Sequence, residues 1–293
     1  MNKKIQDFLN VSSKRELASC LGIEYHILIY NLYKLDDDDK YITFKIKKKN
    51  NGFRTIIAPD SGIKFFQELL SKILLEIYPA KNCVHGYLLE KSIKTNAQVH
   101  LKKKILINID LKDFFPSINF GRVYGIFKSH PFNFNHTIST TLAQICCYKG
   151  ILPQGAPTSP ILSNYVCRKL DNELIDLAKK GRFNYTRYAD DLTFSTNVLP
   201  LPKELGTISD NQFIISDELT EIIENNGFKL NNEKVRYATK FNRQEVTGLI
   251  VNEFVNVKRT YIRQVRAMLN SWEKYGVYEA AREHFERYNS KNK

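Results

Sequence analysis

Short stretches of alternating apolar and polar residues run through the chain, the pattern of strands that bury one face. Ile42, Phe44 and Ile46 alternate with polar neighbours. The pair Asn51-Gly52 that follows is a strong signal for a two-residue hairpin turn. We therefore predict a half-buried hairpin with a strongly basic tip. Its basic residues are Lys47, Lys48, Lys49 and Arg54.

Apolar residues recur at helical spacing in several longer segments. Ser13 and Glu16 have the spacing of a capping box at the start of the first segment. Pro79 ends the second and Gly181 the third, and both residue types commonly follow a helix. The acidic run 36–39 is expected to be a solvated loop. The predicted helices span residues 13–33 (one or two helices), 65–77, 159–181 and 259–272.

Acidic residues occur where two predicted strands end. A mainly apolar run that begins at Ile105 predicts a buried strand, which delivers Asp110 at its C-terminal end. Asp190 and Asp191 lie at the tip of a second hairpin, where adjacent acids are most often ordinary turn residues. If the three carboxylates converge, they can hold two divalent metals about 3.5–4 Å apart, the arrangement of nucleotidyl transfer. Mg²⁺ suits such a site, because it binds few carboxylates and leaves positions for phosphate oxygens.

These residues resemble motifs of the reverse transcriptases. The strand with Asp110 and Phe115 is similar to their first catalytic motif, and Tyr-Ala-Asp-Asp at 188–191 is similar to their second. Pro153-Gln154-Gly155 and the segment 227–234 resemble two further motifs, and all four occur in the family's order. Each piece alone is weak, but their joint occurrence is highly specific.

Two elements resemble bacterial retron reverse transcriptases in particular. The segment 96–100 resembles their Asn-Ala-x-x-His element, and 246–248 resembles their Val-Thr-Gly element. The segment 85–87, His-Gly-Tyr, points the same way. The resemblance covers roughly residues 12–275 of the 293.

The resemblance implies an α+β right-hand polymerase with fingers, a palm of antiparallel sheet backed by helices, and a short or truncated helical thumb. The thumb is expected to be short because no further apolar segment follows Trp272. The chain is then a fragment, has a minimal thumb, or relies on another polypeptide. The implied division is 1–40 N-terminal helices, 41–104 fingers, 105–121 palm with the first catalytic strand, 122–155 fingers–palm connection, 156–251 palm and 252–293 start of the thumb.

The family roles carry over to matching positions. Asp110 and Asp190 would bind both Mg²⁺ ions with help from the backbone carbonyl of Leu111, while Asp191 would lie near the primer terminus. Phe115 would exclude a ribose 2′-hydroxyl, although its residue type alone also fits an ordinary core aromatic. The implied nucleotide-binding residues are Lys47, Arg54, Asp113, Phe115, Gln154 and Lys234. The implied nucleic-acid contacts are Asn96, His100, Gly155, Tyr188, Thr247, Gly248, Arg259, Arg263 and Arg266.

Several of these contacts have a structural alternative. His100 on the same helical face as Asn96 is more often a structural histidine. Thr247 and Gly248 also fit a simple tight turn. The arginines at 259–266 form either a solvated helix face or a stripe that tracks a nucleic-acid duplex.

Composition agrees with a nucleic-acid partner. The chain has 44 Lys and Arg against 31 Asp and Glu, which gives a formal charge of +13. This charge alone fits a polyanionic partner and an ordinary solvated surface equally well. Together with the motifs, it favours a polyanionic partner. The five cysteines form no Cys-x-x-Cys pair, so neither a zinc site nor a disulfide framework is indicated. No stretch is apolar and long enough for a signal peptide or a membrane span.

The expected function is therefore retron-type RNA-directed DNA synthesis in the bacterial cytoplasm. By resemblance, the partners are a cognate non-coding RNA, the RNA–DNA hybrid, deoxynucleoside triphosphates and a retron effector protein. The product would be a branched RNA–DNA (msDNA) that serves in anti-phage defence. The alternatives are a reverse transcriptase of group II intron or abortive-infection type, and a nucleic-acid-binding scaffold without polymerase activity.

Overall fold

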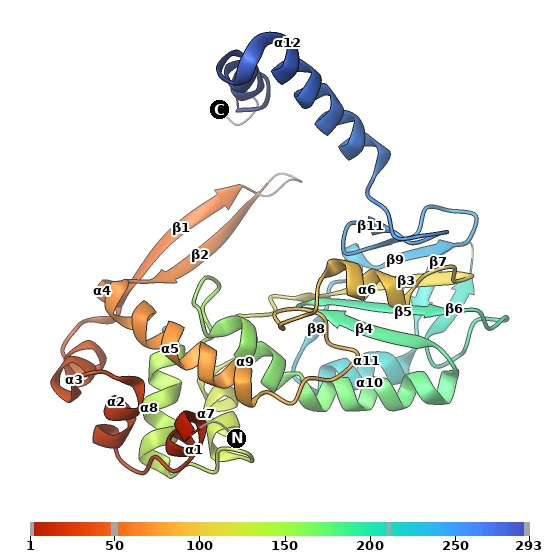
Figure 1. The fold of residues 1–293 in the computed structure, drawn as a ribbon. Helices are drawn as coiled ribbons and strands as arrows, with labels where there is room; N and C mark the ends of the chain where they lie inside the picture. The colour runs from red at the N-terminus through yellow and green to blue at the C-terminus, as the bar shows by residue number, and fades with distance from the viewer. Residues whose placement is uncertain (1–2, 48–51, 210–211, 290–293) are drawn as a thin grey trace.

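The computed structural model of the chain describes residues 3–47, 52–209 and 212–289. A helical lobe and a sheet lobe lie side by side, and a hairpin and a long helix project from them (Figure 1). The helices are α1 (Lys3–Leu9), α2 (Lys14–Leu21), α3 (Tyr25–Tyr33), α4 (Asp37–Lys40), α5 (Ser61–Ile77), α6 (Ile93–Val99), α7 (Phe120–Lys128), α8 (His136–Cys146), α9 (Ser159–Val166), α10 (Arg168–Gly181), α11 (Asp217–Asn225), α12 (Arg259–Asn289) and the 3₁₀ turn η1 (Asn232–Lys234). The strands are β1 (Tyr41–Lys47), β2 (Phe53–Pro59), β3 (Ile105–Lys112), β4 (Asn184–Tyr188), β5 (Asp191–Thr196), β6 (Gly206–Ser209), β7 (Gln212–Ile215), β8 (Lys229–Leu230), β9 (Arg236–Thr239), β10 (Glu245–Val246) and β11 (Leu249–Ile250).

The helical lobe forms around the apolar face of α5. Phe66, Leu70 and Leu74 of this helix are buried, whereas Phe65, which we predicted to be core, is half exposed. The N-terminal region has more helix than predicted, because α1 precedes the expected segment. The acidic run 36–39 is also not a loop, since most of it forms the short helix α4.

The predicted helix 159–181 consists of two successive helices, α9 and α10, that meet at Cys167. Ser159 was expected to cap its start. The cap position is Thr158 instead, and the Ser159 hydroxyl donates to the carbonyl of Pro153. This bond ties the start of α9 to the segment that contains Gln154.

The sheet lobe is built on antiparallel strands in the order β4-β5-β3-β8, with β9 pairing the part of β3 that β8 leaves free. Successive side chains along a strand point to opposite faces of the sheet, so the two faces carry different residues. Tyr185 and Phe194 point toward α10, which lies with α11 along one side of the sheet (Figure 1). Thr186 and Ser195 point the other way, toward α6. The predicted antiparallel sheet backed by helices is confirmed.

The hairpin β1–β2 pairs Phe44 with Ile56 and stands out from the body (Figure 1). The prediction that it is half-buried is wrong, because Ile42, Phe44 and Ile46 are 45–60% exposed. Only its base packs on the protein, where the amide of Ile57 donates to the carbonyl of Gln154. Part of the predicted turn, together with Lys48 and Lys49, lies outside the described residues.

The C-terminal helix α12 extends the predicted helix well past residue 272 and breaks at Gly276, where φ is +78°. Met268 and Trp272 face Val277 and Phe285 across a hollow of about 500 Å³ between its two arms. No helix in the described ranges could cross a lipid bilayer. The predicted division into fingers, palm and thumb stays a prediction, although α6, assigned to the fingers, packs against β4 and β10–β11 of the sheet lobe.

Candidate active site

The three predicted acidic residues converge at one end of the sheet. Asp110 is the cross-strand partner of Asp191 in the pairing of β3 with β5. Asp190 lies in the turn between β4 and β5, and its carbonyl accepts a hydrogen bond of 3.1 Å from the amide of Leu111. The N–H and C=O of a strand residue point to the same side, so the Leu111 carbonyl also faces this turn. Residues 80 positions apart in the sequence therefore meet.

The site carries more negative charge than its surroundings neutralise. Burial, followed by the charges of Asp190 and Asp110, raises the pKa of Asp191 to about 6. Burial likewise raises the pKa of Asp190, and Asp110 adds to the rise. The positive charges of Lys234 and Arg54 offset only part of it. A site of this kind gains stability from a bound cation.

Lys234 currently supplies positive charge to the first carboxylate. Its Nζ lies 2.9 and 3.1 Å from the two carboxylate oxygens of Asp110. The side chain of Asn231 also donates to Asp110, at 3.0 Å. We predicted that Lys234 binds the nucleotide; the structure places it on a carboxylate that would bind metal.

Oxygen donors and excess negative charge fit hard divalent cations such as Mg²⁺. Within residues 3–47, 52–209 and 212–289, however, no three acidic, histidine or cysteine side chains are grouped as a preassembled metal site. The residues therefore match a divalent site in chemistry without forming a preassembled one.

The turn that carries Asp190 rests on a buried ion pair that the sequence did not reveal. Arg187 and Asp171 are both fully buried and bind in a bidentate manner, with both N–O distances at 2.8 Å. Nη1 of Arg187 donates to the side chain of Asn164 at 3.0 Å and to the carbonyl of Ala189 at 3.4 Å. Ala189 has a left-handed backbone with φ of +58°. The guanidinium thus holds the strained residue next to Asp190.

Two sequence signals could have found this pair. Asp171 interrupts the apolar face of α10 between Leu170 and Leu174, and Arg187 occupies an inward-facing position on β4 next to Tyr185. Charged residues are rarely buried unless they are paired. An acid and a base that both occupy inward-facing positions are therefore expected to form an ion pair with each other.

The His-Gly-Tyr segment supports the same turn from the other side. The amide of His85 donates to the carbonyl of Arg187, and the amide of Arg187 donates to the carbonyl of Cys83, so this segment runs beside β4. A β-carbon on Gly86 would lie 2.7 Å from the amide nitrogen of Ala189. Only glycine fits at this distance. The resemblance at 85–87 thus has a structural basis in its packing against the turn that carries Asp190.

The predicted nucleotide-binding residues differ in exposure and packing. Phe115 is half-buried and its ring contacts that of Phe114 edge to face. A β-carbon on Gly155 would lie 2.9 Å from the side chain of Ile56, so the segment of Gln154 fits closely under the hairpin. Three further predicted residues are exposed: Lys47, Arg54 and Asp113.

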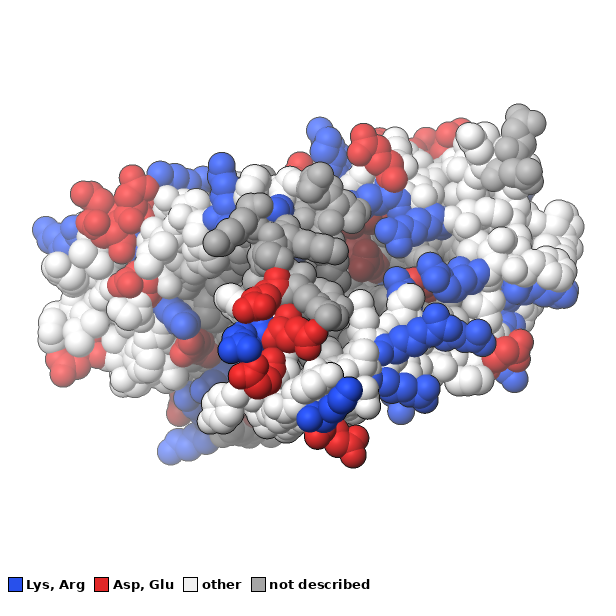
Figure 2. Space-filling view, turned by 90° about the horizontal axis from the view of Figure 1, so that it is seen from above, with Lys and Arg blue, Asp and Glu red and all other residues white. Residues whose placement is uncertain are grey.

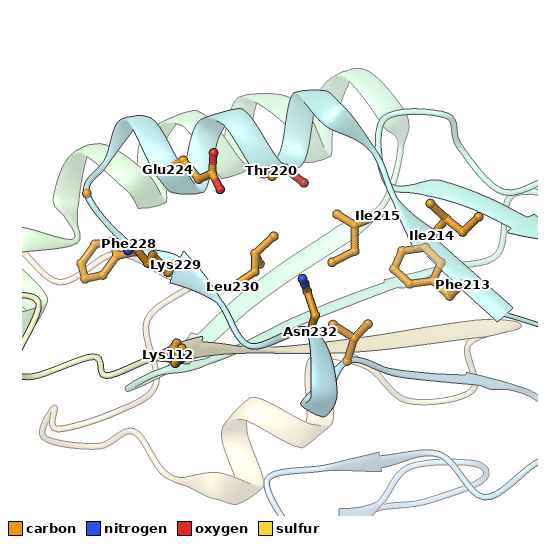
Figure 3. Close-up of a pocket in the computed structure, with 12 residues that line it drawn as sticks. Lys112, Phe213, Ile214, Ile215, Thr220, Glu224, Phe228, Lys229, Leu230 and Asn232 are labelled. Atoms are coloured by element: carbon orange, nitrogen blue, oxygen red, sulfur yellow. The ribbon is translucent and has the colours of Figure 1, made fainter.

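Thr247 and Gly248 lie beside the acids. Together with Asp110 and Asp191 they line one hollow of about 240 Å³. Tyr188 is half-buried at the end of β4. The arginines of α12 do not line this hollow; Arg259, Arg263 and Arg266 are exposed on the projecting helix. A larger hollow, of about 930 Å³, lies elsewhere, between α11, β7 and β8, and contains none of the three acids (Figure 3).

Asn96 and His100 were predicted to contact nucleic acid, but both are fully buried. The ring nitrogens of His100 lie 2.6 Å from the hydroxyl of Ser195 and 2.7 Å from that of Thr186. Burial lowers the pKa of His100 to about 3, so the ring is neutral. No side-chain surface remains for direct contact with nucleic acid in this conformation. We interpret His100 as a structural support between the end of α6 and the sheet.

Comparisons with known proteins agree with this geometry. Residues 46–252 match the family model described as reverse transcriptase (RNA-dependent DNA polymerase). The chain is 33% identical over 290 residues to the Retron Mx162 reverse transcriptase of Myxococcus xanthus, a match that covers 90% of this chain and 59% of that protein. It is 34% identical over 261 residues to the Retron Ec86 reverse transcriptase of Escherichia coli, covering 89% of this chain and 78% of that protein.

The fold is also similar to that of a telomerase from Candida albicans, solved with a fragment of telomeric RNA. The TM-score is 0.50 at 11% sequence identity, and the match covers 79% of this chain and 50% of the telomerase chain. At this identity the similarity concerns the fold alone. The chain also spans only about three fifths of the length of the Mx162 enzyme.

Proposed function

Because the chain belongs to the reverse transcriptases of retron type, we propose that it is an RNA-directed DNA polymerase that extends a primer on a cognate structured RNA. The observation that carries this proposal is the pairing of Asp110 with Asp191 beside Asp190. The substrates are deoxynucleoside triphosphates, and the partners are the RNA template and the growing RNA–DNA hybrid.

We assign metal binding to Asp110, Asp190 and Asp191, with the Leu111 carbonyl as a further ligand; of the three acids, Asp191 lies next to the primer terminus. When bound, two Mg²⁺ ions would activate the primer hydroxyl and neutralise the charge that develops on pyrophosphate. In this scheme Lys234 would give up its contact with Asp110 when the metal ions bind. Its ammonium would then be available to the triphosphate, the role that the family resemblance implies for Lys234.

The remaining roles follow from the resemblance to the family. Arg54 and Lys47 project from the hairpin and neutralise the incoming triphosphate. Phe115 lies under the sugar of the incoming nucleotide and excludes a 2′-hydroxyl. Gln154 and Gly155 lie beside the nascent base pair. Asp113 lies at the margin of the nucleotide pocket. Three groups contact the primer and the duplex: Tyr188, then Thr247 with Gly248, then the arginines at 259, 263 and 266.

The retron assignment extends the proposal to the product. The protein would prime from its own non-coding RNA and make a branched RNA–DNA that acts with an effector protein in anti-phage defence, in the bacterial cytoplasm. Its similarity to retron enzymes supports this assignment over a group II intron or abortive-infection type.

Primer extension tests the proposal. The purified chain is incubated with an RNA template, an annealed DNA primer, deoxynucleotides and Mg²⁺, and is compared with Asp190→Asn and with the matched variant Asp176→Asn, whose carboxylate is exposed on α10. We expect template-dependent synthesis in the wild type and in Asp176→Asn, and none in Asp190→Asn. Retained RNA binding without synthesis by any of the three would instead show a scaffold.

A further inference from the structure

A basic surface lies at the end of the sheet opposite the three acids. A hollow of about 640 Å³ opens where β3 begins and β9 ends, next to the loop 199–203. Ile105, which lines the hollow, and Asp110 are five positions apart on β3, so the hollow is about 17 Å from the acids at about 3.4 Å per residue. We call this hollow the lysine groove. The residues that line it include Lys104, Lys203, Lys240, Leu199, Tyr237 and Phe241.

The lysines of the groove form a like-charge cluster. Ile105 pairs with Thr239, and the amide of Lys240 donates to the carbonyl of Lys104 at 2.8 Å, so these two lysines face each other across the strands. Like charges directly opposite each other destabilise a sheet. Among the described residues that line the groove, none is acidic. Such a cluster is stabilised by an anion from outside the chain.

The groove also offers an aromatic surface. Phe241 is 88% exposed, and the ammonium of Lys240 lies 4.9 Å from its ring centroid. Leu199, on the facing loop, is 59% exposed. An exposed ring beside lysines in one groove is the combination by which proteins bind single strands, since a base stacks on the ring while the lysines contact phosphates.

Basic side chains also gather elsewhere on the sheet lobe. Seen from above, Lys and Arg side chains gather on the right, over the sheet lobe (Figure 2). The neighbouring sequence adds Lys102 and Lys103, which directly precede Lys104. The electrostatic attraction for a polyanion is therefore not confined to the three groove lysines.

We propose that the lysine groove binds a single-stranded segment of RNA outside the primer–template site. Lys104, Lys203 and Lys240 contact successive phosphates, and Phe241 stacks on a base. The choice of RNA over DNA rests on the proposed function; the preference for a single strand rests on Phe241 and the groove itself. A template-bound polymerase would thereby hold a second part of the same RNA.

The test uses a fluorescent 12-residue oligouridine and measures its anisotropy. The full chain is first saturated with a chain-terminated primer–template, so that the polymerase site is occupied. The variant Lys104→Gln with Lys240→Gln is compared with a matched control on α5, Lys64→Gln with Lys72→Gln, both exposed and far from the groove in sequence. Phe241→Ala tests stacking separately, and ordinary primer extension is measured for every variant.

Each phosphate neutralised on a single strand contributes about 0.7 to the slope of log K against log salt. Loss of two contacts should reduce this slope by about 1.4 and weaken binding about 25-fold at 0.1 M salt. We expect this change in the groove variant, weaker binding in Phe241→Ala, and no change in the α5 control. Primer extension on a short template should be unaffected in all of them.

Three outcomes would overturn the proposal. The first is equal oligouridine binding by the groove variant and the control. The second is a fall in primer extension in parallel with binding, and the third is tighter binding of an acidic peptide than of oligouridine to the groove. If the wild type makes no DNA but binds oligouridine through the groove, the groove stands and the proposed function fails.

Discussion

Variants of the buried pair of Arg187 and Asp171 can separate the effect of the pair on stability from its effect on catalysis. Asp171→Asn leaves the Arg187 charge buried without its counterion, although the shape of the side chain is kept. Breaking a buried ion pair in this way costs about 3–5 kcal/mol of unfolding free energy. At about 2.1 cal/mol/K of unfolding entropy per residue, over 293 residues, the melting temperature should fall by about 5–8 °C.

The double variant Arg187→Met with Asp171→Leu tests the role of the pair in positioning. An apolar pair of similar volume often replaces a buried ion pair with little loss of stability. Here the buried hydroxyl of Tyr185 also loses its acceptor on Asp171, which costs about 1–3 kcal/mol, so the melting temperature should stay about 2–5 °C below that of the wild type. The carbonyl of Ala189 still lacks its donor. Primer extension should therefore remain about three- to tenfold slow, the effect of a hydrogen bond of about 0.7–1.4 kcal/mol.

The assays are thermal unfolding and single-turnover primer extension at saturating Mg²⁺ and nucleotide. If the double variant recovers its rate, Arg187 does not position the turn that carries Asp190. If Asp171→Asn melts at the wild-type temperature, the ion pair does not stabilise the fold.

Three further predictions address the nucleotide pocket, the buried histidine and the metal. Phe115→Ala should admit ribonucleotides in competition with deoxynucleotides, and unchanged selectivity would refute its assignment as a steric gate. Burial lowers the pKa of His100 in the folded protein to about 3, whereas its pKa in the unfolded chain is about 6.5. As the pH falls, the unfolded chain therefore binds a proton before the folded protein does, and the folded protein loses stability. The urea-unfolding free energy should therefore drop by about 2.5 kcal/mol more between pH 6 and pH 4 in the wild type than in His100→Gln, and equal pH slopes would contradict this. Millimolar Mg²⁺ should raise the melting temperature of the free protein, because it relieves repulsion between Asp190 and Asp191; no shift would count against a metal site.

Local sequence patterns predicted the elements that carry the acids. The apolar run before Asp110 indicated a buried strand, and Tyr-Ala-Asp-Asp indicated a hairpin tip; both are present, in β3 and between β4 and β5. The resemblance to a family then placed the two segments together. The strand pairing of Asp110 with Asp191 supplies the direct evidence for that contact.

Features that depend on packing between distant segments were not predictable. Alternation indicated the strand with Phe44 but could not show that nothing in the described chain covers its apolar face. Helical spacing placed Asn96 and His100 on one face but did not reveal that the sheet covers that face. The contact of Lys234 with Asp110 joins residues 124 positions apart, and no local pattern encodes it.

The central claim is that Asp110, Asp190 and Asp191 together bind two divalent ions at the end of a growing DNA strand. Electron paramagnetic resonance of Mn²⁺, in a complex with an RNA template, a chain-terminated primer and the incoming deoxynucleotide, counts these ions and reports their coupling. We predict two spin-coupled Mn²⁺ ions per wild-type chain and loss of the coupled pair in Asp110→Asn. A coupled pair that persists in Asp110→Asn, or a single uncoupled ion in the wild type, would contradict the account.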